Sequence, residues 1–165
     1  TELLGELLRQ RAERWVVMLH APEAVRQCQP GATARLVVGA PPVEVTGRVV
    51  RLHPGTYVEA EPRHGGKRTN HMGPTALLEV GEGGLLALTT LRHPPFSLGA
   101  LTCLGVEPSR MRILVVKAAI AYKAAYAPVV GEVIEAGTPG ITSASLRAFS
   151  YRHAPSLYPL DATPV

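Results

Sequence analysis

Apolar and polar positions alternate along the chain in patterns that predict both helices and strands. Leucines recur at helical spacing in Glu2–Glu13, with charged residues between them, which favours an amphipathic helix. Trp15–Leu19 is a short and continuously apolar run, as expected for a buried strand. In Val43–Leu52, valines and Gly47 alternate with polar residues, so one face of this strand is predicted to pack on a core.

Turn residues and shorter apolar runs predict the other elements. A helix is expected from Pro22 to about Gln29, because proline suits the first turn of a helix. His53–Thr56 is expected to be the turn of a β-hairpin that pairs Val43–Leu52 with Tyr57–Ala60. We further expect helices at Phe96–Leu104 and Tyr122–Tyr126, and strands at Thr33–Val38, Thr75–Val80, Leu85–Thr90, Ile113–Val116 and Val133–Glu135.

The order of these elements predicts an α/β fold with a mixed, mostly antiparallel sheet and flanking helices. The 165 residues suit a single domain, 1–165, without an internal repeat or a linker. No apolar run approaches the roughly 20 residues of a membrane span, and no signal-peptide pattern opens the chain. A cytoplasmic protein with no membrane partner is therefore expected. The start at Thr1 in place of Met suggests a fragment or a processed N-terminus.

Charge gives little support for a nucleic-acid partner, and none is expected. The formal net charge is +4, and most of the basic residues are scattered. Arg63–Arg68 is the one concentrated basic segment, inside a polar stretch, Glu61–Asn70, that is predicted to be a loop. It lacks aromatic residues that would stack on bases, which favours a loop facing solvent or an active site. A nucleic-acid-binding domain stays as an alternative that rests on charge alone.

Residues with catalytic or metal-binding chemistry do not form a known motif. The six histidines include no HExxH pair. His64 and His71 share the basic loop without an adjacent acid, and His53 and His93 each precede a proline, so surface or turn positions are expected for them. Residues 81–84 read as a hairpin turn and not as a phosphate-binding loop, and no GxSxG motif is present. We therefore expect no catalytic residue and no metal ligand in this chain.

The two cysteines, Cys28 and Cys103, are far apart in the sequence and do not form a CxxC motif. Both lie among apolar or small residues, so the favoured interpretation is a pair of reduced, buried thiols in a reducing cytosol. The sequence leaves a disulfide between them open.

Judged by the order of the predicted strands and helices alone, Lys117 is the strongest candidate for a functional contact. It follows the apolar strand Ile113–Val116 and precedes a helical stretch that is rich in small residues. A strand, a lysine and a helix in this order form an α/β corner, where open sheets usually hold their ligands. Lys117 is therefore a candidate contact for an anion or a carboxylate, and the alternative is a solvated lysine at the end of a strand.

Short segments spread over nearly the whole chain are similar to segments of a known protein family. They are Thr1–Leu8, Pro22–Val25, Gly31–Gly39, Val45–Val49, Met72–Ala76, Leu114–Lys117, Tyr122–Pro128, Thr138–Gly140 and Tyr158–Asp161. Their order and spacing resemble the C-terminal end of the microcystinase C (MlrC-type) zinc metallopeptidases, and together they are more specific than any one segment.

The resemblance implies a place beside a metal centre and not a metal centre within this chain. Zinc would be bound by Asp and His residues of a larger N-terminal catalytic domain, where it would polarise the scissile carbonyl. This chain would pack on that domain and help to line a cleft for a peptide or a small amide, and a homo-oligomer is left open. Lys117 would contact a substrate carboxylate, with Tyr122, Lys123 and His71 as further candidates for the cleft wall.

Three positions depart from the pattern of the family. Ala118 and Ala121 stand where the related proteins tend to carry Ser and His, and Ala21 stands where they carry Asp. No side-chain chemistry is left at these positions. The departures therefore support an alternative, a non-catalytic binding or assembly module of a diverged member that kept the fold.

Overall fold

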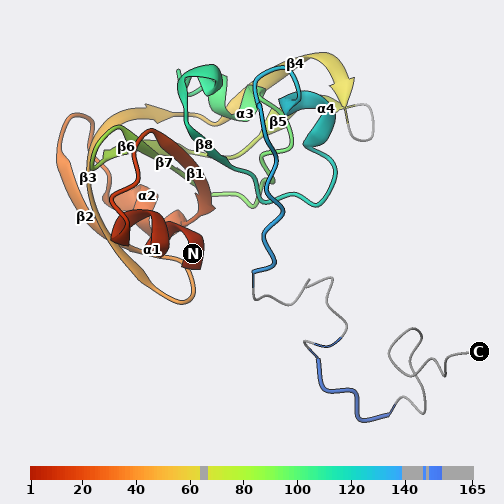
Figure 1. The fold of residues 1–165 in the computed structure, drawn as a ribbon. Coiled ribbons are helices and arrows are strands. Elements are labelled where there is room, and N and C mark those ends of the chain that lie inside the picture. Colours follow the sequence, from red (N-terminus) through yellow and green to blue (C-terminus); the bar gives the residue numbers. More distant parts are fainter. Residues whose placement is uncertain (64–66, 139–146, 148, 154–165) are drawn as a thin grey trace, which may run out of the picture. The chain divides into compact units, whose positions relative to one another are not determined.

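The structure is a computed structural model of the chain, and it describes residues 1–63, 67–138, 147 and 149–153 (Figure 1). The chain divides into two compact units, Thr1–Gly131 and Glu132–Val165. The first unit holds α1 (Glu2–Arg9), β1 (Trp15–His20), α2 (Pro22–Gln27), β2 (Thr33–Val38), β3 (Val43–His53), β4 (Thr56–Arg63), β5 (Lys67–His71), β6 (Thr75–Val80), β7 (Gly84–Thr89), α3 (Gly99–Thr102), the 3-10 helix η1 (Pro108–Arg110), β8 (Ile113–Val115) and α4 (Lys123–Tyr126).

A six-stranded sheet lies at the centre of this unit, with the strand order β2-β3-β6-β7-β1-β8. The neighbours from β2 to β7 pair antiparallel, whereas β1 runs parallel to both β7 and β8. The predicted α/β fold with a mixed, mostly antiparallel sheet is confirmed. β1 has both faces covered, with Val17 in one core and Val16 in the other, and for this reason its sequence is continuously apolar.

Two apolar cores cover the two faces of the sheet. On one face, α1 and α2 contribute Leu4 and Val25 to a core that the strands complete. On the other face, α3, α4 and the β4–β5 hairpin contribute Leu101, Tyr126 and Tyr57. In Figure 1, these three elements gather on one side of the sheet, away from α1 and α2.

The end of α1 explains why the helix is shorter than the predicted Glu2–Glu13. The amide of Ala12 donates to the carbonyl of Leu7 (2.9 Å), and the amide of Arg11 donates to the carbonyl of Leu8 (3.1 Å). These two hydrogen bonds form a Schellman motif, which closes a helix. Arg11 has a φ of 51°, a left-handed conformation that glycine adopts at far lower cost.

The predicted pairing of Val43–Leu52 with Tyr57–Ala60 is wrong. β3 pairs with β2 and β6, and β4 pairs with β5 in a separate two-stranded sheet. The segment Glu61–Asn70, predicted as a loop, holds the end of β4 and most of β5, while residues 64–66, with His64, lie outside the described residues. Its polar sequence concealed the strand, because a ribbon with one face in solvent needs few apolar residues.

Two other elements differ from their predictions. The helix expected at Phe96–Leu104 is shorter and forms only at α3. Separately, no helix in the described part of the chain is long and apolar enough to cross a membrane. The strand expected at Val133–Glu135 is not formed, and Ile134 is 82% exposed. A short apolar run becomes a strand only where a neighbour supplies partners for its backbone. Most of the resembling segments Thr138–Gly140 and Tyr158–Asp161 lies outside the described residues.

Both cysteines are free thiols, and the predicted burial is confirmed for Cys28 but not for Cys103. Cys28 is buried beneath α2, and Cys103 is half-buried after α3. Burial raises the pKa of each thiol. Neither side chain is therefore set up as a reactive thiolate.

Candidate functional site

Lys117 lies two residues beyond β8, which is one of the two edge strands of the sheet. β8 ends at Val115, and the amide of Ala118 donates to the carbonyl of Val116 (3.0 Å), which turns the chain out of the sheet. The Lys117 side chain is exposed. Lys117 therefore follows the C-terminal end of a strand that runs parallel to β1, the position that the predicted α/β corner requires.

Tyr122 and Lys123 lie at the start of α4. Tyr122 is half-buried, and its ring meets the ring of Tyr126 edge to face, with the centroids 6.2 Å apart. Lys123 is the first residue of the helix and is exposed. The structure thus places Lys117, Tyr122 and Lys123 on one stretch of chain between β8 and α4.

His71 belongs to a different part of the domain. It ends β5, its side chain is exposed, and its Nδ1 lies 3.2 Å from Oγ1 of Thr56. The next pair in the same ladder, Tyr57 and Asn70, is buried. Because successive residues of a strand face opposite sides, His71 lies on the solvent face of the hairpin and not beside the buried one.

Glu59, Ser97, Tyr57 and His93 form a connected set of side chains that the sequence did not predict, called the polar array below. Tyr57 and Glu59 are two positions apart on β4, so they project from the same face of the strand. His93 and Ser97 lie in the loop between β7 and α3, on either side of Pro94 and Pro95. The array therefore joins the β4–β5 hairpin to a loop that follows the main sheet.

Hydrogen bonds link the four side chains in sequence. Oη of Tyr57 lies 2.8 Å from Nε2 of His93 and 3.4 Å from Oγ of Ser97, and the Ser97 hydroxyl donates to the Glu59 carboxylate. Ser97 is 1% exposed, Tyr57 6% and Glu59 8%. A buried hydroxyl or carboxyl is costly without partners, so these contacts are needed for the hairpin to pack here at all.

Neighbouring elements close tightly around the array. A Cβ at Gly99, the first residue of α3, would lie 2.7 Å from the Tyr57 ring and 3.2 Å from Oε1 of Glu59. The hydroxyl of Tyr126 on α4 donates to the carbonyl of Pro95 (2.9 Å). α4, which begins at the predicted site residue Lys123 and has Tyr122 as its N-cap, is therefore anchored to the same loop as β4.

Burial sets the protonation states within and beside the array. It lowers the pKa of His93, and the Glu59 carboxylate opposes that shift. It raises the pKa of Tyr57 to about 12 and raises that of Tyr126 as well, where the nearby Tyr57 adds to the effect. Near neutral pH the array thus contains a neutral imidazole and a neutral phenol.

Sequence reasoning placed His93 in a turn before a proline, and it does lie in an irregular loop. What the reasoning missed is that His93 has a buried partner on a strand far away in the sequence. A usable signal was the alternation Tyr57-Val58-Glu59, in which a tyrosine and a carboxylate share one face of a strand. Val58, 68% exposed, shows that the polar pair and not the valine points inward.

The residues that the structure describes do not fit a zinc site. Across the part of the chain that the structure describes, no three His, Cys, Asp or Glu side chains are placed to share a metal ion. The polar array contains two possible ligands, Glu59 and His93, but Tyr57 and Ser97 stand between them. Catalytic zinc needs about three protein ligands around one point, so no zinc chemistry can be derived from these residues.

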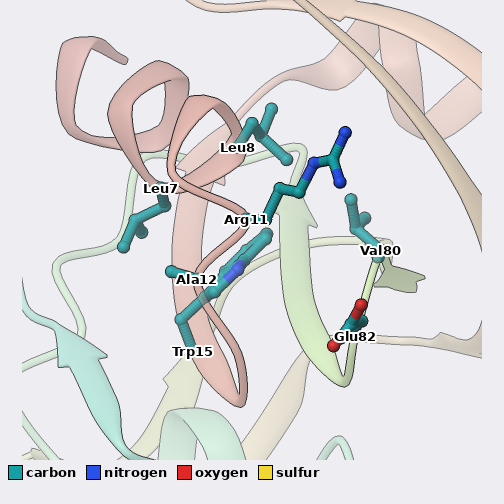
Figure 2. Close-up of a pocket in the computed structure, with 8 residues that line it drawn as sticks. Leu7, Leu8, Arg11, Ala12, Trp15, Val80 and Glu82 are labelled. Carbon is teal, nitrogen blue, oxygen red and sulfur yellow. The ribbon is translucent and has the colours of Figure 1, made fainter.

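A separate apolar pocket lies between the end of α1 and the β6–β7 turn (Figure 2). Its volume is about 310 Å³, and it is lined by Leu7, Leu8, Arg11, Ala12, Trp15, Val80, Gly81 and Glu82. Figure 2 shows the Trp15 ring between α1 and Val80, with Arg11 above it. Its lining includes Arg11 and Ala12 of the Schellman turn, and it holds none of the predicted site residues.

Comparison with the sequence profiles of protein families shows which family the chain belongs to. The sequence profile of the family described as "MlrC C-terminus" matches residues 1–153. This chain belongs to that family. The predicted resemblance to the C-terminal part of MlrC-type proteins is confirmed for the domain, whereas the residues proposed for its cleft stay predictions.

A crystal structure supports the fold of this MlrC C-terminal domain. A protein from Mesorhizobium sp. BNC1, whose name places it among the metallopeptidases, superimposes with a TM-score of 0.83 at 23% sequence identity. The match covers 100% of this chain and 35% of the Mesorhizobium chain, so the domain spans about a third of that protein. No curated protein sequence matched the chain.

Proposed function

We propose that this MlrC C-terminal domain completes the substrate cleft of a zinc peptidase whose metal is bound by an N-terminal catalytic domain of the same protein. The observation that carries the proposal is the family match over residues 1–153. It is supported by the Mesorhizobium relative, which is named for metallopeptidase activity and in which a domain of this fold is only 35% of the chain. The substrate would be a peptide or a small amide, and the protein would act in the cytoplasm.

Within this proposal, Lys117 supplies the positive charge at the cleft. It is exposed and follows the end of a parallel strand, so its ammonium group is accessible to a substrate carboxylate. Tyr122 and Lys123 on α4 extend the same wall, and His71 contributes from the hairpin. The polar array supports this wall indirectly, because the bond from Tyr126 to the Pro95 carbonyl holds α4 in position.

The test uses the full-length protein, assayed for zinc content by mass spectrometry and for peptide hydrolysis. Lys117→Ala should raise KM or lower kcat without changing zinc content or thermal unfolding. Arg35→Ala is the matched control, because it removes an exposed positive charge from β2, at the opposite edge of the sheet. Unchanged kinetics in Lys117→Ala would remove Lys117 from the site.

A second candidate function is a non-catalytic binding or assembly module. Ala118 and Ala121, both half-buried beside Lys117, favour it because they cannot supply the Ser and His chemistry of related proteins. Full-length protein that is free of zinc and inactive on peptides would support this module. Sedimentation of the same sample would show whether it assembles into a homo-oligomer.

A further inference from the structure

We propose that the polar array is a pH-sensitive tie, in which uptake of one proton at His93 reorders the hydrogen bonds of Tyr57 and Ser97 and loosens the 93–97 loop from β4. The inference concerns this domain alone and does not rest on the proposed function. It starts from the geometry of the array, in which two buried hydroxyl groups, those of Tyr57 and Ser97, connect one half-buried imidazole to one buried carboxylate.

With His93 neutral, the array consists of two hydrogen-bonded pairs. We place the hydrogen of neutral His93 on Nδ1, so that Tyr57 donates its hydroxyl hydrogen to Nε2 across 2.8 Å, and Ser97 donates its own to the Glu59 carboxylate. The 3.4 Å contact between Tyr57 and Ser97 joins the pairs only weakly. Each pair fastens the loop to β4 at one of its two ends, near His93 and near Ser97.

A proton added at Nε2 of His93 reverses the first bond. The imidazolium then has no lone pair, so it can only donate, and the Tyr57 oxygen must accept. The Tyr57 hydrogen is displaced toward Oγ of Ser97, and Ser97 continues to donate to Glu59. All four groups now form one directed chain, with a positive charge at the loop and a negative charge on β4, and no covalent bond other than N–H is made.

Burial decides the direction of the effect on the loop. The surroundings of His93 favour the neutral ring, and Glu59 only partly offsets this, so the protonated ring is held less well in place. The other titratable or charged groups near the array are Tyr126 on α4, Cys103 after α3, and Arg51 of β3 beside Cys103. The protonated array also depends on the long Tyr57–Ser97 contact of 3.4 Å, so we expect the proton to weaken the attachment of the loop, and α4 to share the change through the Pro95 carbonyl.

The first test is a histidine titration by NMR in the full-length protein, labelled at histidine Cε1. Glu59→Gln should lower the pKa of His93, and the same substitution made in a Ser97→Ala background should shift it much less. The signal of His71, which lies on the opposite face of the same hairpin, is the internal control and should not differ between the variants. The proposal is overturned if Glu59→Gln leaves His93 unchanged, or shifts it equally with and without Ser97.

The second test measures the loop itself. Hydrogen exchange of the Phe96 and Ser97 amides, corrected for the chemical effect of pH, should become faster when His93 is protonated. In Tyr57→Phe, which keeps the ring but removes the hydroxyl, exchange should already be fast and should not respond to pH. Equal corrected rates on both sides of the His93 transition in the unaltered protein would overturn the proposal.

Discussion

Tyr57 and His93 are 36 positions apart in the sequence, yet a 2.8 Å hydrogen bond joins their side chains, and their rings stand at 86° to one another. The contact matters because the β4–β5 hairpin forms a sheet of its own and does not pair with the central one. Its position is therefore set by side chains, of which Tyr57 is the most buried aromatic on the hairpin. The bond from Tyr126 to the Pro95 carbonyl brings α4 into the same packing unit.

Gly99→Ala should destabilise the domain by about 1–3 kcal/mol, because the new methyl group would overlap the Tyr57 ring. The ring cannot move away without breaking its bond to His93, so the overlap outweighs the gain in helix propensity. Gly131→Ala is the matched control, since nothing lies within 4 Å of a Cβ there, and it should change stability by less than about 0.5 kcal/mol. Urea unfolding measures both variants. Equal stability would show that the packing around Tyr57 is loose.

His93 should make stability depend on pH in the mildly acidic range. Its pKa in the folded state lies below the ordinary value of 6.5, so the unfolded chain binds the proton more readily. The stability linked to His93 is therefore present above pH 6.5 and is lost as the pH falls through the folded-state pKa. His93→Gln cannot take up this proton, so its unfolding free energy should fall less between neutral and acidic pH. Parallel pH curves for the two proteins would contradict the expectation.

Ala21→Asp should stabilise α2 by roughly 0.5–1 kcal/mol. Ala21 is the N-cap residue of α2, has an extended φ of −153°, and offers no side-chain cap to the first amides of the helix. An aspartate would accept a hydrogen bond there and would also interact favourably with the helix dipole. Ala21→Asn separates the two effects, because it caps without charge. Thermal unfolding of the three proteins should rank Asp first and Ala last, and the reverse order would show that the N-cap is inaccessible.

Arg11→Gly should stabilise the domain by up to about 1 kcal/mol, because glycine adopts the φ of 51° without strain. Arg11→Ala is the matched control: it removes the same side chain from the pocket of Figure 2 but keeps the strain. The difference between the two variants therefore isolates the backbone term. If alanine stabilised as much as glycine, the cost would lie in the arginine side chain and not in the Schellman turn.

Strands of the central sheet could be predicted from the sequence where their apolar residues follow a regular pattern. Trp15–Leu19 is apolar throughout because both faces of β1 are covered by other elements. In β3, Val45 and Val49 alternate with polar residues because only one face of that strand is covered. The β4–β5 hairpin could not be predicted in the same way. Lys67–His71 is entirely polar, and it forms a strand because β4 supplies its hydrogen-bond partners.

By itself the sequence determined the class of fold, the buried strands and the lysine that follows the last strand, because these depend on the spacing of apolar residues along a local stretch of chain. Only the tertiary structure decided which strands pair, and only it brought Glu59 and Tyr57 against Ser97 and His93. The physical reason is that a buried hydrogen bond between distant residues leaves no periodic trace in the sequence. Its partners are chosen by the path of the chain, and burial then sets the charge that each can carry.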